Sequence, residues 1–439
     1  MKRTILSKLI EWKNNADKAP LLIEGGRQVG KTWLMQEFGK TAYNNVIYVN
    51  FDSADAERLK KIFEPDLNPK RIVEDLEFAF KQKISPTDTL IIFDEIQECN
   101  RALVSLKYFC EDAPQYNIVS AGSLLGVALH KNQSFPVGKT HTINLYPMTF
   151  TEFLDAIGEE RLTEVINNLD FHRIAICKEE IIRNLKYYFY VGGMPRAVLE
   201  FIKTKNLNSV REIQMDILNG YKSDFSKHIS AVSIPKTSMI WDSLPRQLAK
   251  ENKRFLYKDM KSGARAAQFE DSLFWLERVG LVYKINRINV PMLPLIAYSQ
   301  NEIFKLFTID IGLLSAEANI EISAFTEPNN ELFTHYKGSL TEQFVLQELK
   351  AANAHIPIYY WANERGIAEL DFVIQFQNMI IPIEAKASTN TKARSLKFYM
   401  QQFNPQAAIR FSLTDYTKNK NLYDIPLYLI SRFAEIIRQ

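Results

Sequence analysis

The chain has 439 residues, 46% of them hydrophobic, and its 54 Lys and Arg nearly balance its 51 Asp and Glu, which leaves a formal net charge of +3. This length and apolar content indicate a multidomain soluble protein. The near-neutral charge excludes a global field for polyanions, so any nucleic-acid site must be a local patch. The three cysteines show no CxxC spacing, which excludes a zinc pattern and favours a reducing compartment over a disulfide framework.

No apolar run approaches the length that spans a bilayer. The first residues, "MKRTILSKLIEWKNN", are interrupted by charges before a signal-type segment develops. We therefore expect a cytoplasmic protein with no membrane partner.

Residues 20–125 alternate short β-like runs with amphipathic stretches of helical length. The runs are "PLLIEGG", "NVIYVNFD", "TLIIFDE" and "YNIVSAG". Parallel strands need crossover helices between them, and strands buried on both faces read as continuous apolar runs. The pattern predicts an α/β domain with a parallel sheet, which we place at residues 1–150.

The rest of the chain divides into three further regions. Residues 151–228 lack β-like runs and predict helices, interrupted by the turn "VGGMPRAV". Residues 229–325 follow the order helix, short helix, helix and hairpin, which is typical of a winged-helix domain. Residues 326–439 return to helix, strand, strand and helix, which predicts another α/β domain with its own core.

The segment "GGRQVGKT" (25–32) matches GxxxxGK[ST] and lies between the apolar run "PLLIE" and the helical run "WLMQEF". In this motif glycines let the backbone wrap around phosphates, the lysine reaches the β- and γ-phosphate oxygens, and the last hydroxyl binds Mg²⁺ at a helix N-terminus. The alternative is a glycine-rich turn without a ligand. The expected nucleotide-binding residues are Gly25, Gly26, Arg27, Gln28, Val29, Gly30, Lys31, Thr32 and Trp33, with Thr32 also a metal ligand.

Two carboxylates end the buried-type strand "TLIIFDE". Asp94 would hold the Mg²⁺ shell, and Glu95 would polarise the water that attacks the γ-phosphate. The alternative is that both residues cap the next helix. Ser123, at the end of "NIVSAGS", is a candidate γ-phosphate sensor, although a small polar residue there is also an ordinary turn. No arginine lies between 124 and 150, and the weaker candidates for an arginine finger are Arg101, Lys139 and Arg196.

The segment "IPIEAKAS" (381–388) is an apolar strand that ends with Glu384 and Lys386 on one face, because side chains alternate along a strand. Asp371 lies thirteen residues earlier, in a strand that leads into a hairpin at "QNM". This is the D…ExK spacing of the PD-(D/E)xK nucleases. Two carboxylates would bind Mg²⁺ against the scissile phosphate, and the lysine would orient or deprotonate the attacking water.

A further carboxylate, Glu342 in "GSLTEQFVLQELK", shares helical spacing with apolar residues and could be directed to the metal. Its alternative is a capping box, Ser339-x-x-Glu342, at the start of that helix. For Glu384 and Lys386 the alternative is a surface ion pair on an edge strand, which is common and contributes little. We expect catalytic roles for Glu342, Asp371, Glu384 and Lys386, and metal binding by Asp371 and Glu384.

The segment "KENKRFLYKDMKSGAR" (250–265) is rich in basic residues and precedes a helix whose apolar stripe is Phe269, Leu273 and Leu276. That stripe would face the core and leave the other side of the helix free for a DNA groove. The alternative is a lid or protein contact with solvated lysines. The expected nucleic-acid contacts are Lys253, Arg254, Lys258, Lys261 and Arg265, together with Lys392 and Arg394 near the C-terminal cluster.

Several segments together resemble a known family: "LLIEGGRQVGKTWLMQEF", "LIIFDEIQ", "SFPVGKTHTINLYPMTFTEFL" and "YVGGMPRAV" near the front, and "FKLFTIDIGLLS" and "GSLTEQFVLQEL" further on. They are similar to prokaryotic AAA-superfamily ATPases with a C-terminal domain of unknown function, DUF4143. The resemblance implies a RecA/AAA-like P-loop NTPase core, a helical lid at 151–228, a winged helix and a restriction-endonuclease-like α/β domain at the C-terminus. The preference for ATP rests on this resemblance.

These observations lead to three hypotheses. The first is an ATP-hydrolysing, Mg²⁺-dependent machine whose nuclease-like domain acts on nucleic acid, with DNA favoured over RNA. The second is an ATP-switched regulator whose nuclease-like domain binds nucleic acid or a protein without cutting. The third is a defence or signalling ATPase triggered by a protein partner. In each, ATP binding could drive assembly of a homo-oligomer.

Overall fold

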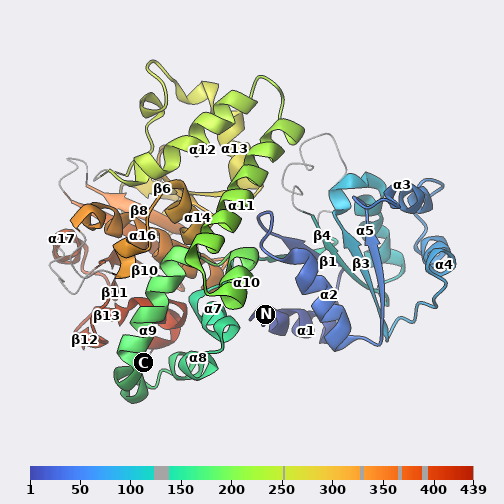
Figure 1. The fold of residues 1–439 in the computed structure, drawn as a ribbon, viewed down its shortest axis with the longest axis horizontal. Coiled ribbons are helices and arrows are strands. Elements are labelled where there is room, and N and C mark those ends of the chain that lie inside the picture. The colour runs from blue at the N-terminus through green and yellow to red at the C-terminus, as the bar shows by residue number, and fades with distance from the viewer. Residues whose placement is uncertain (123–137, 251–252, 327–330, 364–367, 388–393, 439) are drawn as a thin grey trace. The chain divides into compact units, whose positions relative to one another are not determined.

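The computed structural model describes residues 1–122, 138–250, 253–326, 331–363, 368–387 and 394–438 (Figure 1). These residues form two compact units. The five-stranded unit comprises Arg3–Tyr146 with Arg278–Gly280, and the eight-stranded unit comprises Met1–Lys2, Pro147–Glu277 and Leu281–Gln439. None of the described helices combines the length and apolar composition needed to cross a membrane.

The five-stranded unit contains the parallel sheet that the apolar runs predict. Its strand order is β2-β3-β4-β1-β5, and every pairing is parallel. Both central strands β3 and β4 are buried along their whole length, as expected when helices cover both faces of a sheet. The strands are β1 (Leu21–Glu24), β2 (Asn45–Asn50), β3 (Thr89–Asp94), β4 (Asn117–Ala121) and β5 (His141–Asn144).

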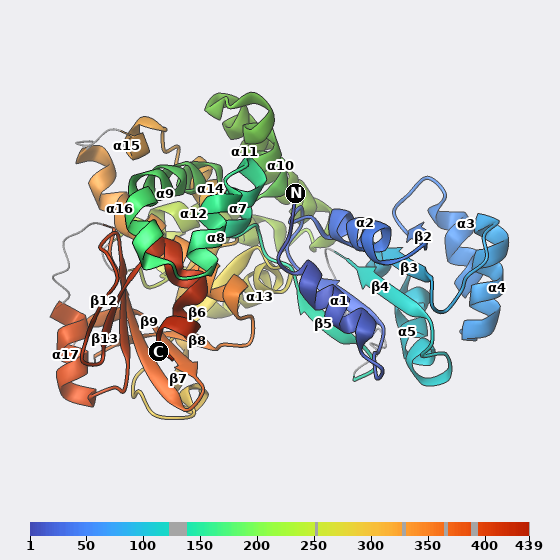
Figure 2. The ribbon, with the colours of Figure 1, turned by 90° about the horizontal axis from the view of Figure 1, so that it is seen from below.

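The helices of this unit surround the sheet (Figure 2). They are α1 (Leu6–Asn14), α2 (Lys31–Ala42), α3 (Ala56–Lys60), α4 (Pro69–Phe80) and α5 (Asn100–Asp112). One core cluster joins β2 and β3 to α4 and α5, with Phe51, Phe63 and Phe93 in mutual ring contact. The predicted α/β class with a parallel sheet is confirmed for this region.

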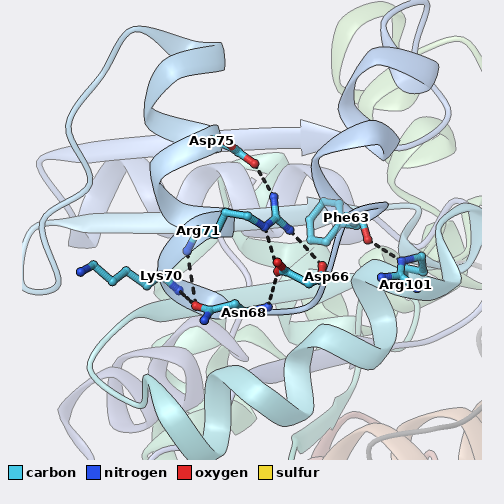
Figure 3. A network of polar contacts seen from close by, with 7 residues as sticks. All are labelled: Phe63, Asp66, Asn68, Lys70, Arg71, Asp75 and Arg101. Carbon is cyan, nitrogen blue, oxygen red and sulfur yellow. Dashed lines mark hydrogen bonds and ion pairs between the residues drawn. The ribbon is translucent and has the colours of Figure 1, made fainter.

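The start of α4 shows how side chains define a helix end (Figure 3). The Asn68 side chain accepts a hydrogen bond from the Lys70 backbone N–H at 2.9 Å, and Pro69 occupies the first helical position. Arg71 forms ion pairs with Asp66 and Asp75. This network joins the helix to the segment before it.

The eight-stranded unit contains a mixed sheet of order β12-β13-β11-β10-β9-β8-β6-β7. The pairings β10–β11, β11–β13 and β6–β8 are parallel, and the others are antiparallel. The strands are β6 (Val282–Ile288), β7 (Ser299–Thr308), β8 (Ile358–Ala362), β9 (Glu369–Phe376), β10 (Met379–Ala385), β11 (Ala408–Ser412), β12 (Thr417–Asn419) and β13 (Leu422–Pro426).

Helices precede and cover this sheet (Figure 2). Those before the first strand are α7 (Phe150–Ile157), α8 (Glu160–Asn167), α9 (Phe171–Val191), α10 (Pro195–Thr204), α11 (Leu207–His228), α12 (Ile234–Leu248) and α13 (Glu270–Arg278). Those after it are α14 (Ile311–Glu317), α15 (Ser323–Thr326), α16 (Glu331–Ala352), α17 (Arg394–Phe403) and α18 (Phe433–Ile436). The helical character expected for 151–228 therefore appears as α7 to α11.

The hairpin expected to form the wing of a winged helix is instead part of the large sheet. The order helix, short helix, helix and hairpin is present, but the hairpin β6–β7 joins the large sheet, because Arg287 and Ile288 pair with Tyr360 and Trp361 of β8. A strand that pairs on both sides leaves no exposed edge, which is the physical reason for the continuous sheet. The expected boundary at residue 325 thus runs through one sheet, and a separate winged-helix domain is not confirmed.

Candidate functional sites

The loop from Gly25 to Gly30 connects β1 to α2 and has the backbone that the motif requires. Gly25 has φ 147°, and a Cβ there would lie 2.2 Å from the Leu145 carbonyl oxygen, so only glycine fits. Gly30 has φ 99° and directly precedes α2, and Gln28 also takes a left-handed conformation, with φ 66°. The loop therefore bends tightly into the N-terminus of α2, where backbone N–H groups can bind phosphate.

Lys31 lies inside this loop. Its Nζ donates hydrogen bonds to the carbonyl oxygens of Gly25 and Gly26, both at 2.8 Å. The side chain is 6% exposed, and burial lowers the pKa of Lys31 to about 8, although Glu95 and Asp94 act to raise it. An anionic phosphate in the loop would add a further charge that favours the protonated form.

Asp94 ends β3 beside the first turn of α2. Its Oδ2 accepts hydrogen bonds from the Thr32 hydroxyl at 2.7 Å and from the Tyr48 hydroxyl at 2.8 Å. Burial raises the pKa of the Asp94 carboxyl, and the two hydroxyl donors oppose that shift. The predicted metal ligands Thr32 and Asp94 thus meet, and their hard oxygen atoms suit Mg²⁺.

Glu95 has a left-handed backbone, with φ 49°, which is uncommon for a residue with a long side chain. Such strain costs about 1 kcal/mol or more and is concentrated at functional sites. The Gln97 amide donates to Glu95 Oε2 at 2.7 Å and orients the carboxylate. Sequence reasoning missed Tyr48 and Gln97, although a tyrosine in the strand beside β3 was a usable signal.

The other residues predicted for the nucleotide site differ in their exposure and partners. Val29 is buried, its carbonyl oxygen accepts from Arg3 at 3.0 Å, and Trp33 is 39% exposed on α2. Ser123 lies outside the described residues. Each candidate for an arginine finger has a local partner: Arg101 donates to the Phe63 carbonyl oxygen (Figure 3), Lys139 pairs with Glu111 at 2.9 Å, and Arg196 pairs with Asp216 at 3.7 Å.

Asp371 and Glu384 come together on neighbouring strands. The register of β9 and β10 pairs Phe372 with Ile383, so the next step places Asp371 opposite Glu384. Asp371 Oδ2 accepts a hydrogen bond from the Ala385 backbone N–H at 2.7 Å. Lys386 Nζ lies 2.5 Å from Glu384 Oε1. The three residues predicted from the spacing D…ExK therefore lie in one cluster.

Glu342 reaches the same cluster from α16, where two lysines meet it. Lys253 forms an ion pair with Glu342, and Lys305 on β7 lies 3.9 Å from Glu342 Oε2. Lys305 also lies 2.5 Å from Glu369 Oε1. Sequence reasoning missed Lys305 and Glu369. The signal was Lys305 itself, because a lone lysine in the apolar run "IFKLF" must find a carboxylate when it is buried.

Burial and mutual repulsion shift the pKa values of the carboxylates in this cluster in different directions. Burial raises the pKa of Asp371 well above its usual range, and Glu342 and Glu384 raise it further. Burial acts in the same direction on Glu342, but Lys253 and Lys305 overcome it and hold the pKa of Glu342 low. Burial likewise raises the pKa of Glu384, against the effect of Lys386. Three ion pairs join the cluster: Lys253 with Glu342, Lys305 with Glu369, and Lys386 with Glu384.

The fit of this cluster to Mg²⁺ is partial. Glu342 Oε2 and Glu384 Oε2 are buried and accept no hydrogen bond from the described residues, so two hard oxygen ligands are available. However, no group of three or more His, Cys, Asp or Glu side chains in the described part of the chain has the geometry to hold a metal ion. Lysine ammonium groups supply the positive charge instead. Metal binding by Asp371 and Glu384 stays a prediction.

The basic residues expected to contact nucleic acid differ in exposure. Lys253 is only 10% exposed in its ion pair with Glu342, so it is a member of the buried cluster rather than a surface contact. Arg254, Lys258, Lys261, Arg265 and Arg394 are exposed, and Lys392 lies outside the described residues. The stripe of Phe269, Leu273 and Leu276 is buried, as predicted.

Helix α16 also contacts the chain segment that leaves the five-stranded unit, which starts at Pro147. The Phe150 backbone N–H, at the start of α7, donates to Glu348 Oε1 at 2.9 Å. Met148 N–H donates to the Gly193 carbonyl oxygen at 2.7 Å. Burial raises the pKa of Glu348 to about 8. One helix therefore carries Glu342 and, six residues later, an anchor for residues 148–150.

Family models match three parts of the chain. Residues 17–154 match an AAA domain, residues 182–323 match a domain of unknown function (DUF8612), and residues 337–430 match a domain of unknown function (DUF4143). Residues 17–154 therefore form an AAA-type, P-loop ATPase-like domain. The expected AAA and DUF4143 similarities are confirmed, whereas the DUF8612 match crosses the expected boundary at residue 228. No curated protein matches the chain.

Solved structures with a similar backbone fold include three proteins. The Walker-type ATPase PABY2304 of Pyrococcus abyssi is 15% identical, with 71% of this chain and 94% of that chain covered and a TM-score of 0.43. The Aeropyrum pernix ORC1 protein in complex with DNA is 14% identical, with 73% and 92% covered and a TM-score of 0.27. Drosophila ORC bound to DNA is 14% identical, with 72% and 93% covered and a TM-score of 0.28. At these TM-scores the likenesses carry no argument about function.

Proposed function

We propose that the chain binds and hydrolyses ATP with Mg²⁺ in its five-stranded unit, and that this reaction controls a nuclease-like site in its eight-stranded unit. The observation that carries the first half is the hydrogen bond from Thr32 to Asp94 directly beside Lys31 and the phosphate loop. These are the three groups that a triphosphate and its metal need, and they come from the predicted motifs.

In this proposal the residues of the first site divide the work. The loop N–H groups and Lys31 bind the β- and γ-phosphates, and Thr32 and Asp94 would hold Mg²⁺. Bound Mg²⁺ supplies charge neutralisation at the γ-phosphate. Glu95, oriented by Gln97, accepts the proton of the attacking water. Arg27, Gln28 and Trp33 complete the loop and helix start.

The second half of the proposal rests on the meeting of Glu342, Asp371, Glu384 and Lys386. Asp371 and Glu384 would hold a divalent cation through oxygen atoms, with Glu342 in support, and Lys386 would orient the attacking water. The substrate class would be a nucleic acid, with DNA favoured over RNA. Exposed Arg254, Lys258, Lys261, Arg265 and Arg394 would supply a local positive surface for its phosphates.

In this proposal, coupling between the halves would run through α16. The segment that follows the five-stranded unit is hydrogen-bonded to Glu348, and Glu342 lies on the same helix. A helix of 22 residues transmits a shift at one turn to the next, because its backbone hydrogen bonds keep it rigid. A movement of residues 147–150 during the nucleotide cycle would thus reposition Glu342.

The ATPase half is tested by Mg²⁺-dependent phosphate release from ATP. The full chain should turn over ATP, Lys31→Ala should abolish turnover, and Lys40→Ala, an exposed lysine later in the same helix, should not change it. Unchanged turnover in Lys31→Ala would reject the assignment of this site.

The nuclease half is tested by incubation with single- and double-stranded DNA and RNA, with Mg²⁺ or Mn²⁺, and with or without ATP. Cleavage that is lost in Asp371→Asn but kept in Asp415→Asn, an exposed carboxylate of the same unit, supports the proposal. A preparation that cuts nothing in the presence of either metal contradicts it.

A second candidate function is favoured by the two lysines at Glu342. Because Lys253 and Lys305 already neutralise this carboxylate, the cluster could be a structural ion network in a domain that binds nucleic acid or a protein without cutting. Binding of an oligonucleotide without cleavage, or ATP turnover stimulated by a protein partner, would support this alternative. Gel filtration with and without ATP would show whether subunits assemble.

A further inference from the structure

The eight-stranded unit contains a cavity of about 750 Å³ beside α17, a size typical of sites for small organic groups. One wall is a single line along α17: Arg394, Phe398 and Gln402 follow one another at intervals of four residues and all line the cavity. Such residues share one helix face, with about 6 Å between successive members. This face presents a cation, an aromatic ring and an amide in a row.

The aromatic ring on that wall is available for contact. Phe398 is 43% exposed, although Leu396 and Tyr399 of the same helix are buried in the core. Trp361 forms the floor, with its ring 6.4 Å from that of Phe398 and inclined at 27°, which is close to parallel. A flat aromatic molecule placed on Phe398 would therefore continue an existing stack.

Polar groups complete the cavity. Asn289, from the connection between β6 and β7, and Asn363, after β8, also line the cavity. Their side-chain oxygens accept from the backbone N–H groups of Val290 and Ala368, respectively. The Trp361 Nε1–H group is buried and has no acceptor among the described residues. The NH₂ groups of these amide side chains can donate to the acceptor atoms at the edge of a heterocycle, which a purely apolar group lacks. Arg394 adds a positive charge at one end.

The cavity lies close to the carboxylate cluster. Ala368 lines the cavity, and Asp371 lies three residues further on, about 10 Å away along β9 at the usual rise of a strand. The Glu369 backbone N–H donates to the Ser395 hydroxyl at 3.4 Å, and Glu369 is paired with Lys305 of the cluster. A chain of nucleotides with one phosphate at the cluster could therefore place a nearby base in the cavity.

We propose that this cavity binds one unpaired nucleobase of a single-stranded nucleic acid, with the base stacked on Phe398, its edge read by Gln402 and the asparagines, and a phosphate at Arg394. The proposal rests on the proposed function, because it requires nucleic acid as the ligand. It adds to that function a preference for an unpaired strand next to the cutting site. An aromatic stacking platform beside a cation is the arrangement that single strands need.

The test uses the full chain without divalent cations and measures fluorescence anisotropy of labelled single-stranded and duplex oligonucleotides. Phe398→Ala should weaken single-strand binding about tenfold or more, as expected for the loss of one stacked base. Phe398→Trp should keep the affinity, and Phe78→Ala, an 88% exposed phenylalanine of the other unit, should leave it unchanged. Duplex binding should be weaker and little affected by Phe398→Ala.

Oligonucleotides with abasic positions provide the decisive comparison. If a base occupies the cavity, Phe398→Ala should have no further effect on an oligonucleotide whose bases are removed along the bound stretch. An equal loss with intact and abasic strands, or no loss with either, would overturn the cavity proposal but leave nucleic-acid binding standing. Absence of all oligonucleotide binding would overturn both proposals. Loss of self-association in Phe398→Ala with unchanged oligonucleotide affinity would assign the surface to a protein contact and also overturn the cavity proposal.

Discussion

The phosphate loop and the C-terminal cluster both bring a lysine next to carboxylates, but they are assembled differently. At the loop, Lys31 and Thr32 come from one motif, and Asp94 ends a single strand with Glu95 directly after it. At the cluster, four carboxylates and three lysines come from α16, β7, β9, β10 with the residue that follows it, and the segment at Lys253. The first site depends on local backbone geometry, whereas the second depends on how distant elements pack. The difference shows which site can be understood from its motif alone.

The largest expected effects come from removal of one lysine at each site, because each substitution should abolish one activity and spare the other. Lys31→Ala should reduce ATP turnover about a thousandfold, because it removes the cation at the transferred phosphate. Lys386→Ala should reduce Mg²⁺-dependent cleavage by a similar factor and leave ATP turnover within about twofold of the unmodified chain. Both activities are measured on the same preparations. Loss of both activities in Lys386→Ala would mean that the sites are not independent chemical centres.

Removal of Lys253 should show whether the cluster needs its lysines. Lys253→Met should lower the free energy of unfolding by about 3 kcal/mol, because Glu342 then keeps a buried charge with weaker compensation. Added Mg²⁺ should restore more stability to this variant than to the unmodified chain, since a cation can replace the missing charge. Thermal unfolding with and without Mg²⁺ measures both effects.

The matched control for that variant is Lys250→Met, three residues earlier, where the lysine pairs with Asp259 at the surface. We expect a change of less than about 1 kcal/mol there. If Lys253→Met is as harmless as its control, the buried ion pair is not important for stability.

The anchor on α16 should respond to pH in a defined direction. The pKa of Glu348 is raised from an ordinary 4.5 to about 8, so between these values the unfolded chain releases a proton that the folded chain retains. Stability from this group is present below about pH 4.5 and is lost as the pH rises towards 8. Glu348→Gln should remove this loss, so the variant should gain more than about 1 kcal/mol relative to the unmodified chain between pH 5 and pH 8.5.

Chemical denaturation at the two pH values measures that gain. Glu152 is the other carboxylate that raises the pKa of Glu348, and it is present in both proteins. Glu164→Gln, an exposed glutamate on α8, should show no pH-dependent difference. A parallel pH dependence of Glu348→Gln and the unmodified chain would contradict the assigned role of burial.

The smallest expected effect concerns Tyr48. Tyr48→Phe removes the 2.8 Å hydrogen bond to Asp94 and should reduce kcat/KM for ATP by about fivefold, the consequence of about 1 kcal/mol. Tyr116→Phe, which removes a hydroxyl group elsewhere in the same unit, should leave it unchanged. Steady-state ATPase kinetics test this, and no change in Tyr48→Phe would mean that Thr32 alone positions Asp94.

Much of the fold follows from sequence patterns, and the failures have a common cause. The apolar runs predict the parallel sheet of the first unit because buried parallel strands lack alternation. The hairpin at residues 282–308 is also recognisable, but its membership of the large sheet is not, because β6 pairs with β8 across some seventy residues of sequence. No local sequence pattern predicts which edge of a sheet a hairpin will pair with.

The candidate sites show the same division. Motif spacing predicts that Asp371, Glu384 and Lys386 meet, because a hairpin brings opposite residues together. It also led to the interpretation of Lys253 as a surface residue, since a lysine in a basic segment is ordinarily solvated. Only the packing of α16 shows that Lys253 reaches Glu342, because that contact joins residues 89 positions apart.

The amino-acid sequence by itself therefore determined the phosphate loop, the acidic strand end and the D…ExK hairpin, because each depends on residues a few positions apart or on one strand and its turn. The tertiary structure alone decided how these groups are neutralised and connected: which lysines balance the buried carboxylates, which helix joins residues 147–150 to Glu342, and where a cavity opens beside α17. These features depend on distant segments that must share a low-dielectric interior, where every charge requires a partner.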